Sequence, residues 1–521
     1  MINTLRSRRG MVTSPHHLAS QAGLSVLREG GTAIEATVAV ASVLSVVYPH
    51  MLSIGGDAFW LVGTGKDDPI AIEACGAAGS KVDTDLYRGH DAIPSRGPLA
   101  ANTVAGAISG WAAALDVSRR WGGKLPLARL LEDAIYLAEH GVPVSDNQAN
   151  VVDDIRAELA PIYGFAPAFA PGGVWPKAGA TLKQPALART LKRLAEVGLE
   201  DFYRGELAKT IAADLAKAGS PLLADDLARH RPQERAPLSI TTSRGTIYNF
   251  PPPTQGIAAL LILGQFDRLN IREAEGFDHI HALIEASKQA YQIRDRIVGD
   301  PAYMKERVDD YLMPTTIDKM AAAIDMKRAK RIKAPTGAGD TAWMGAIDGA
   351  GRAASHIQSV FMAFGSGVVL NETGIVWQNR GASFSLDAKA VNPVMPGRKP
   401  FHTLNPAMAK LKDGRFVTYG TMGAHGQPQF SSAVFSRYAW FDQPFQTAVT
   451  APRWFVDGDK VLTENRVDPS VVAQLRAAGH EIELAGPFVS FFGHAHGIAH
   501  HPDGTLEGAV DPRSDGIVAA F

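Results

Sequence analysis

The chain has 521 residues, of which 46% are hydrophobic and 20% charged, so it can bury a large core and lacks the composition of a disordered protein. Its 52 basic and 53 acidic side chains give a net charge of −1, which argues against a nucleic-acid binder with a strongly basic surface. The single cysteine, Cys75, excludes an internal disulfide framework and any metal site built from several cysteines. At about 150 residues per domain, the length predicts roughly three units.

No segment indicates secretion or membrane insertion. The first residues, MINTLRSRRGMV, are basic, but the apolar segment of a secretory signal does not follow them. The most apolar stretch, Ala36–Tyr48, is shorter than the roughly 20 residues of a membrane span, and it predicts a buried helix. We therefore expect a globular cytoplasmic protein of a size that suits an enzyme, with no membrane and no nucleic acid as partner.

Helical periodicity marks most of the first two-thirds of the chain. In Leu125–Gly141, apolar residues recur at helical spacing until Gly141. The same spacing predicts three later helices, at Leu182–Val197, Leu207–Gly219 and Phe277–Ile297. Two short β-prone runs, Ala58–Gly63 and Thr246–Phe250, predict interspersed strands.

The last third changes to short β-prone segments separated by turn residues. These predicted strands are Ala342–Ile347, Ala353–Phe361, Gly374–Gln378, Phe416–Gly420 and Val461–Glu464. Asp348–Gly351 predicts a hairpin turn between the first two. The shift from helix-rich to strand-rich sequence predicts a layered αβ fold without internal repeats.

A basic segment, Lys327–Asp340, separates the two regions and reads KRAKRIKAPTGAGD. A run of this kind is usually a solvated linker. A nucleic-acid patch is disfavoured because no aromatic residues interleave with the five basic ones. A third interpretation is an exposed segment that leads into a processing site at Thr341.

Motifs that would bring a cofactor or a metal are absent or incomplete. Gly63–Lys66 lacks the earlier glycine of a phosphate-binding loop, and no GxSxG motif of a serine hydrolase occurs. His480-Glu481 lacks the second histidine of a metalloprotease helix. His494 and His496, with His500-His501 nearby, could form a metal site, but ordinary polar histidines are the favoured interpretation. We expect no metal and no cofactor.

Two long blocks and a short terminal motif resemble the γ-glutamyltransferase family of N-terminal nucleophile hydrolases. Ser14–Gly56 contains HLAS, GGTAIEA and a Gly-Gly pair, and Gly339–Gln429 contains GDTAWMGAID, QNRGASFSLD, PGRKPFHTLNPAM and GTMGAHGQPQ. Asp511-Pro512-Arg513 matches near the end. Each motif is weak alone, but the ordered set spans nearly the whole chain and is specific.

The resemblance implies an α/β (α+β) fold, a four-layer αββα sandwich, made as one precursor. The family cuts itself before a threonine, which corresponds to Thr341. The cut between Asp340 and Thr341 would leave a large chain, 1–340, and a small chain, 341–521. These would remain together as a heterodimer forming one interwoven domain; whether that heterodimer associates further is left open.

The chemistry of Thr341 agrees with this role. A threonine hydroxyl needs a base before it can act as a nucleophile. Cleavage would free the α-amine of Thr341, and a terminal amine has a pKa of about 7.7–8.0, so it can accept that proton near neutral pH. The local pattern alone favours a plainer interpretation, in which a β-branched residue begins a strand; the ordered family motifs favour the nucleophile.

The resemblance also assigns groups around the nucleophile. Gly423 and Ala424 stand at the family's Gly-Gly pair, whose backbone N–H groups would stabilise an oxyanion; an ordinary glycine turn is the alternative. Ala424 restricts the backbone if its φ must be positive. Ser359 stands where the family has a threonine that positions the nucleophile, and Phe361 replaces a polar residue.

The substrate-binding positions depart from the family pattern. The family binds an α-carboxylate with an arginine, and Lys81 stands nearest to that position, without the bidentate fork. The cluster that would bind an α-ammonium reads Gln378-Asn379-Arg380-Gly381-Ala382-Ser383. Arg380 and Ser383 replace the family's amide or acid and its aspartate. A cation at Arg380 should repel an ammonium and attract a carboxylate.

We therefore expect Arg380 to bind a substrate carboxylate, with Asn379, Ser383, His402 and Thr403 as neighbouring polar groups. An equally weighted alternative is a salt bridge from Arg380 to a local acid. The first interpretation predicts an amide of a small acid without an α-amino group. Oxamate amidohydrolases and glutaryl-type acylases resemble this family and fit that description.

Three functions follow as hypotheses. The leading one is an autoprocessed threonine amide hydrolase, acting on a γ-glutamyl or similar carboxylate-bearing amide, with transfer to an amine as a variant of the same cycle. The second is a small-acid amidohydrolase. The third is a protein that binds a metabolite as one uncut chain, which the intact Gly339-Asp340-Thr341 motif argues against.

Overall fold

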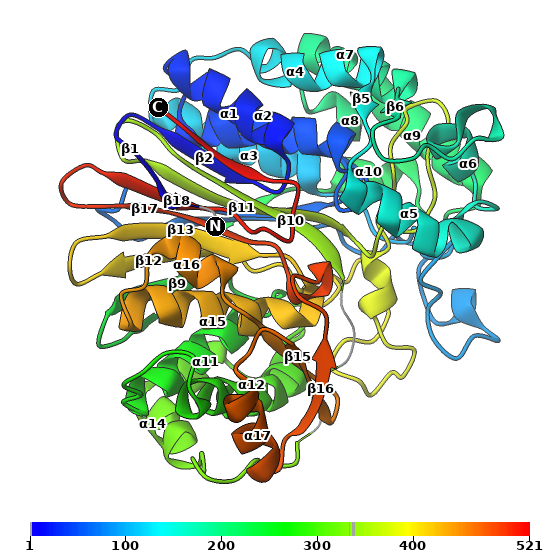
Figure 1. Ribbon diagram of the computed structural model, residues 1–521. Helices are drawn as coiled ribbons and strands as arrows, with labels where there is room; N and C mark the ends of the chain where they lie inside the picture. Colours follow the sequence, from blue (N-terminus) through cyan, green and yellow to red (C-terminus); the bar gives the residue numbers. More distant parts are fainter. Residues whose placement is uncertain (1–2, 333, 336–338) are drawn as a thin grey trace.

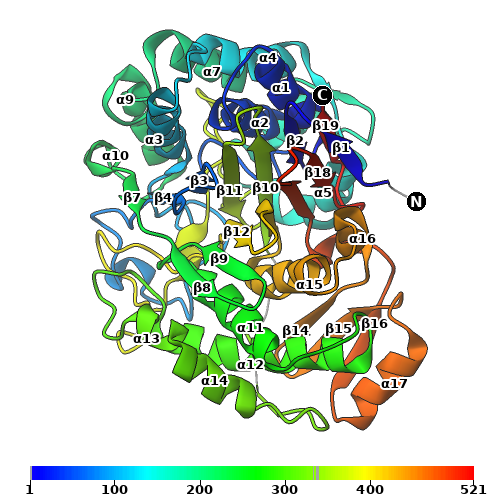
Figure 2. The same cartoon turned by 90° about the vertical axis from the view of Figure 1, so that its left-hand side faces the viewer.

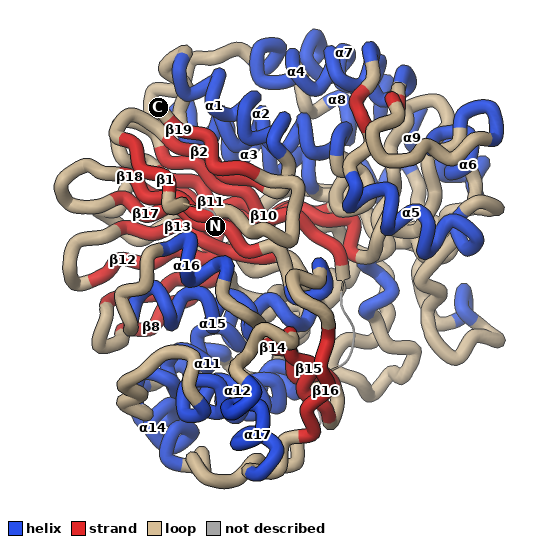
Figure 3. The backbone as a smooth tube through the Cα atoms, viewed as in Figure 1, coloured by secondary structure: helices blue, strands red, loops and turns tan. Residues whose placement is uncertain are grey.

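Two seven-stranded sheets lie face to face and are covered by helices on both outer sides (Figures 1 and 3). The computed structural model describes residues 3–332, 334–335 and 339–521. Figure 2, turned by 90°, shows the same succession of helices, sheet, sheet and helices. The four-layer αββα sandwich that the sequence predicted is confirmed.

The upper sheet in Figure 1 is antiparallel throughout and has β10 and β11 near its middle. Its order is β19 (Ile517–Ala520), β2 (Met11–Ser14), β10 (Asp340–Ile347), β11 (Ala353–Phe361), β3 (Asp57–Gly63), β4 (Ile70–Ala74), β7 (Gln233–Arg235). Nearly every residue of β10 and β11 is buried, because the neighbouring sheet covers one face of these strands and helices cover the other. That double burial explains why these segments read as continuous apolar runs.

The lower sheet is also antiparallel. Its order is β1 (Leu5–Ser7), β18 (Leu506–Ala509), β17 (Ala495–His500), β13 (Phe416–Thr421), β12 (Ala407–Leu411), β9 (Gly245–Asn249), β8 (Leu238–Thr241). Large apolar side chains fill the space between the two sheets, among them Phe59, Trp343 and Met408. Both sheets contain strands from before Asp340 and from after it, so the two parts of the chain are interwoven.

The upper helices come from the first half of the chain. They are α1 (His17–Arg28), α2 (Ala33–Val47), α3 (Ala107–Arg120), α4 (Leu127–His140), α5 (Asp146–Leu159), α6 (Phe165–Phe169), α7 (Pro185–Val197), α8 (Asp201–Arg204), α9 (Glu206–Ala218), α10 (Ala224–Arg229). Helix α2 packs on β10 and β11 and all of its residues are buried, as its apolar sequence predicted. A capping box starts it: Thr32 Oγ1 accepts from the Glu35 N–H, and the Thr32 N–H donates to the Glu35 carboxylate.

The lower helices cover the other sheet. They are α11 (Gly256–Arg268), α12 (Phe277–Ile297), α13 (Val308–Leu312), α14 (Pro314–Ala322), α15 (Gln427–Trp440), α16 (Phe445–Thr450), α17 (Pro469–Ala477). Beside them lies a three-stranded sheet of β14 (Trp454–Asp457), β15 (Lys460–Glu464) and β16 (Glu481–Ala485). A small pair, β5 (Val142–Pro143) and β6 (Thr181–Leu182), lies among the upper helices.

Most predicted elements form, and one is wrong. The four periodic segments correspond to α4, α7, α9 and α12. Gly374–Gln378 forms only two isolated bridges, Val376 with Val369 and Trp377 with Gly55. The chain turns at Gly374, where φ is +70° and an added Cβ would lie 2.5 Å from the Leu187 nitrogen, so the segment cannot extend as a strand.

Two further expectations concern the linker and membranes. The predicted linker, Lys327–Asp340, includes residues 333 and 336–338, which lie outside the described residues. Its Ala329 and Ala334 donate backbone hydrogen bonds to Ala478 and Gly458. Over the described ranges, no helix is both long enough and apolar enough to cross a membrane.

Candidate active site

Thr341 is the second residue of β10 and lies at an irregularity between β10 and β11. Asp340 pairs with Phe361 and Ala342 with Gln358, so the single residue Thr341 lies opposite two residues of β11. The Thr341 hydroxyl donates to the Asp340 carbonyl oxygen at 2.6 Å. The side chain of Thr341 therefore lies against the peptide bond that precedes it, which is the bond the sequence predicts to be cut.

Ser359 completes this contact from β11. Its hydroxyl donates to the same Asp340 carbonyl at 2.6 Å and lies 3.1 Å from Thr341 Oγ1. The Phe361 N–H donates to Ser359 Oγ at 2.7 Å and fixes its orientation. Two hydroxyls thus converge on one carbonyl oxygen, an arrangement that can polarise the carbonyl for nucleophilic attack.

Gly56 brings β3 close to Ser359. A Cβ at Gly56 would lie 2.2 Å from the Ser359 carbonyl oxygen, so only glycine fits there without a backbone shift. The next residue, Asp57, is the cross-strand partner of Ser359. The Gly-Gly pair that ends the first family block therefore sets the distance between β3 and the candidate site.

The turn of Gly423 and Ala424 lies beside the segment that precedes Thr341. Both residues have positive φ, +118° and +41°. A Cβ at Gly339 would lie 2.8 Å from the Ala424 Cβ. The Ala424 carbonyl accepts from Gln255 Nε2 at 2.7 Å, which holds the turn in place. Ala424 thus adopts the conformation that the sequence flagged as restrictive for a residue with a Cβ.

Arg380 is a buried cation next to these groups. Its Nη1 donates to Thr403 Oγ1 at 2.9 Å, and its guanidinium lies 3.3 Å from the centre of the Phe361 ring. Its Nε is buried and has no hydrogen-bond partner. Burial lowers the pKa of Arg380 to about 9, with Asp57 opposing that effect, so the side chain remains cationic at neutral pH. Within the described residues, no carboxylate lies within the 4.0 Å of an ion pair with it.

His402 and Asp57 form a second buried pair. His402 Nε2 lies 3.1 Å from Asp57 Oδ2, and His402 Nδ1 has no partner. Burial and then Arg380 hold the pKa of His402 well below its usual value, so the ring is neutral and donates through Nε2. Burial raises the pKa of Asp57 to about 7, against hydrogen bonds from Gly76, Gln378 and Gly106.

The remaining predicted residues have three different environments. Asn379 is buried and supports the backbone: its Oδ1 accepts from the Met362 N–H and its Nδ2 donates to the Ser95 carbonyl. Ser383 donates to the Phe401 carbonyl at 3.0 Å. Lys81 is exposed and has no described contact with Arg380 or its neighbours, so its assignment as a carboxylate ligand stays a prediction.

Two residues of this region were not singled out from the sequence. Asp57 links His402 to the strand partner of Ser359, and Gln255 donates to the carbonyls of both Thr403 and Ala424. The signal for Asp57 was available, since an acid directly after Gly55-Gly56 opens an apolar run that forms a fully buried strand. Gln255 had no such signal, because it lies at the start of a helix far away in the sequence.

The histidines considered as a metal site have other partners. His494 Nε2 lies 2.9 Å from Ser490 Oγ, and His496 Nδ1 accepts from the Asp511 N–H. Neither belongs to a group of side chains in the described residues that could hold a metal ion. His16, at the start of α1, caps the helix by accepting from the Leu18 N–H, as expected.

Comparison with known proteins agrees with this geometry. A family model described as Gamma-glutamyltranspeptidase matches residues 19–521. The oxamate amidohydrolase proenzyme of Klebsiella pneumoniae subsp. pneumoniae is 47% identical over 522 residues, which cover 99% of each chain. The glutathione hydrolase proenzyme of Escherichia coli is 29% identical, over 100% of this chain and 93% of that protein.

A solved structure supports the same assignment. Cephalosporin acylase from Bacillus halodurans superposes with a TM-score of 0.93 at 34% identity, over 100% of this chain and 97% of that one. The family model, the relatives and the fold agree over almost the full length of the sequence. The chain is therefore an enzyme of the gamma-glutamyltranspeptidase family.

Proposed function

We propose that this enzyme cuts its own chain between Asp340 and Thr341 and then uses Thr341 to hydrolyse an amide of a small acid that carries a carboxylate. The observation that carries the proposal is the convergence of two hydroxyls, from Thr341 and Ser359, on the Asp340 carbonyl oxygen. The word proenzyme in the names of its relatives supports the cut.

The cut is an acyl shift followed by hydrolysis. Thr341 Oγ1 bonds to the Asp340 carbonyl carbon, the bond from that carbon to the Thr341 nitrogen breaks, and the hydroxyl proton ends on the nitrogen. The resulting ester joins Asp340 to Thr341 Oγ1. Water then cleaves the ester, leaving a carboxylate on Asp340 and a free hydroxyl and amine on Thr341.

Turnover repeats this chemistry on a substrate. The free α-amine of Thr341 accepts the proton of its own hydroxyl as Oγ1 attacks the substrate amide carbonyl. That proton passes to the departing nitrogen, the acyl group stays on Oγ1, and water releases it as an acid. Backbone N–H groups of the 423–424 turn would stabilise the oxyanion.

The precursor should not turn over substrate, for two reasons. The nitrogen of Thr341 is an amide before the cut and cannot accept a proton. Thr341 is also buried, and Gly339 packs against the oxyanion turn through Ala424. The preceding segment thus occupies the space beside the turn until the bond is cut.

Arg380 supports a carboxylate on the substrate. Burying a cation without an ionised partner is unfavourable, so a buried arginine that has no ion pair suits an anionic ligand. Of the two interpretations of Arg380, a salt bridge to a local acid is disfavoured by the lack of such a pair in the described residues. An α-ammonium beside Arg380 would be repelled.

Oxamate is the first substrate to test, because the relative that is 47% identical is named for it. A γ-glutamyl amide is the second, because the family model is named for γ-glutamyl transfer. Values of kcat/KM for oxamate, glutaryl-anilide and γ-glutamyl-anilide separate the two. We expect oxamate or the glutaryl compound to be preferred; a clear preference for the γ-glutamyl compound would overturn the role given to Arg380.

A further inference from the structure

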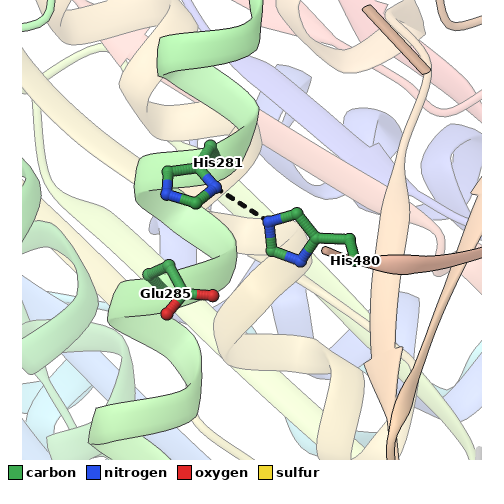
Figure 4. A group of neighbouring side chains, drawn as sticks. All are labelled: His281, Glu285 and His480. Carbon is green, nitrogen blue, oxygen red and sulfur yellow. Dashed lines mark hydrogen bonds between the residues drawn. The ribbon is translucent and has the colours of Figure 1, made fainter. Parts of the chain in front are cut away.

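A buried cluster of two histidines and a glutamate lies outside the candidate active site, between α12 and the start of β16. His281 and Glu285 are four residues apart on α12 and so share one face of the helix. His480 comes from the turn between α17 and β16 and faces them (Figure 4). One ligand atom from each side chain lies within 4.8 Å of the others, and all three residues are buried.

The hydrogen bonds of the cluster define which nitrogens carry protons. His281 Nε2 lies 2.8 Å from the Asp325 carbonyl oxygen, which can only accept, so Nε2 carries the hydrogen. His281 Nδ1 therefore has a free lone pair and accepts from His480 Nε2 at 2.8 Å. This leaves His480 Nδ1 as a buried acceptor with no partner. A buried polar atom without a partner is unfavourable unless a ligand or solvent satisfies it.

Glu285 has two described partners. Lys288 Nζ donates to Oε1 at 2.7 Å, and the Lys330 N–H donates to Oε2 at 3.1 Å. Lys288 Nζ also donates to the Lys330 carbonyl at 2.9 Å. A carboxylate offers about four lone-pair sites, so both oxygens of Glu285 keep capacity for another ligand.

We propose that His281, Glu285 and His480 bind one divalent transition-metal ion, for which Zn²⁺ is the probe. Two imidazoles and a carboxylate suit zinc, whereas magnesium and calcium prefer oxygen ligands. The ligands would be His281 Nδ1, His480 Nε2 and a Glu285 oxygen. The Asp325 carbonyl already holds His281 by its other nitrogen, which is the usual second partner of a metal-bound histidine.

Binding requires one change of tautomer and a small movement. The proton on His480 Nε2 moves to Nδ1 through solvent, so the ring stays neutral and no proton is lost. Nitrogens bound to one tetrahedral zinc lie about 3.3 Å apart, which follows from bond lengths of about 2.0–2.1 Å. The present separation is 2.8 Å, so the two rings must part slightly.

Lys288 is the competing cation at this site. Its ammonium neutralises Glu285 when no metal is bound and would repel a divalent ion nearby. Lys288 can keep its bond to the Lys330 carbonyl when the metal takes Glu285. Replacing Lys288 by glutamine should therefore tighten zinc binding, an effect that adventitious binding elsewhere on the surface would not show.

The ligands come from both sides of the proposed cut, a consequence that depends on the proposed function. His281 and Glu285 precede Thr341 in the chain, and His480 follows it. Glu285 also holds Lys330, in the segment that leads to the bond. A bound metal would join the two cleavage products to one another.

The test is a calorimetric titration of EDTA-treated, dialysed protein with zinc chloride, repeated with Co²⁺ to read the ligand geometry from its visible spectrum. We expect one ion per chain, loss of that site in His281→Gln and His480→Gln, and binding about tenfold or more weaker in Glu285→Gln. Lys288→Gln should bind more tightly. His90→Gln, at an exposed position, is the matched control and should bind as the wild type does.

No saturable zinc binding by the wild type would overturn the proposal, and so would equal binding by the His480→Gln and Glu285→Gln variants. If His281→Gln does not fold, those two variants and Lys288→Gln still decide. The uncut Thr341→Ala variant should bind zinc as well, so failure of the cleavage proposal leaves this test intact. Where the chain is cut, zinc should raise the urea concentration that separates the two products.

Discussion

At the scale of single residues, the account depends on a few side chains around one carbonyl. Thr341 and Ser359 both donate to the Asp340 oxygen. Since Ser359 also lies beside the attacking hydroxyl, it is placed to orient Thr341 and to polarise the bond. This separates its contribution from that of the nucleophile.

Replacing Ser359 by alanine should slow self-cleavage without abolishing it. Loss of one donor to a developing oxyanion costs roughly 10²–10³ in rate. The measurement is the time course of chain cleavage on a denaturing gel, with Ser359→Thr as the variant that keeps the hydroxyl. Wild-type speed in Ser359→Ala would show that this hydroxyl does not act on the Asp340 carbonyl.

Replacing Arg380 by lysine should weaken the use of carboxylate-bearing substrates. Losing a charge-assisted hydrogen bond of about 1.5–3 kcal/mol corresponds to a fall of roughly 10- to 100-fold in kcat/KM. Lys81→Gln tests the competing assignment, and we expect it to change kcat/KM little because Lys81 is exposed. A larger loss in Lys81→Gln than in Arg380→Lys would move the carboxylate contact to Lys81.

Asp57 should make stability depend on pH. Its pKa rises from 3.8 to about 7 on folding because it is buried. Between these values the unfolded chain is ionised and the folded chain keeps its proton, so stability falls as pH rises, by at most about 1.4 kcal/mol per pH unit. Urea unfolding of wild type and Asp57→Asn across this range should show the slope only in the wild type. A constant difference between the two, or a slope of opposite sign, would contradict the protonated state of buried Asp57.

At the scale of elements, the close approach of β3 and β11 positions Ser359. Gly56→Ala would place a Cβ 2.2 Å from the Ser359 carbonyl oxygen, which is backbone and cannot rotate away. We expect this variant to be destabilised and to cleave slowly. Gly276→Ala is the matched control, since nothing lies within 4 Å of an added Cβ there. Thermal unfolding and cleavage should both be near wild type in the control; a Gly56→Ala variant that behaves likewise would disprove the packing argument.

Sequence patterns predicted elements well where one periodicity ran along a segment. Helix α12 has the predicted bounds, and α2 is the buried helix that its apolar run indicated. Gly374–Gln378 failed because its apolar residues are buried by a turn and not by a strand, which composition cannot distinguish. Thr341, Arg380 and His402 came from family motifs, whereas the links made by Asp57 and Gln255 are contacts between distant segments that no local pattern encodes.

At the scale of the molecule, the chain length suggested about three units, but both sheets draw strands from each side of Asp340. A cut at Asp340–Thr341 therefore leaves β10 paired with β11 and β2 and leaves β9 paired with β12. The products should stay associated through these ladders and the core between the sheets. Cleavage then changes the chemistry of one residue while most of the packing persists.

The most direct test of the central claim is the intact mass and amino-terminal sequence of the purified wild type and of Thr341→Ala. The account predicts that the wild type gives two chains, residues 1–340 and 341–521, the second beginning with Thr341. The variant should remain a single chain of 55.5 kDa. A wild type that stays uncut and inert on amides, or a Thr341→Ala variant that splits at the same bond, would contradict it.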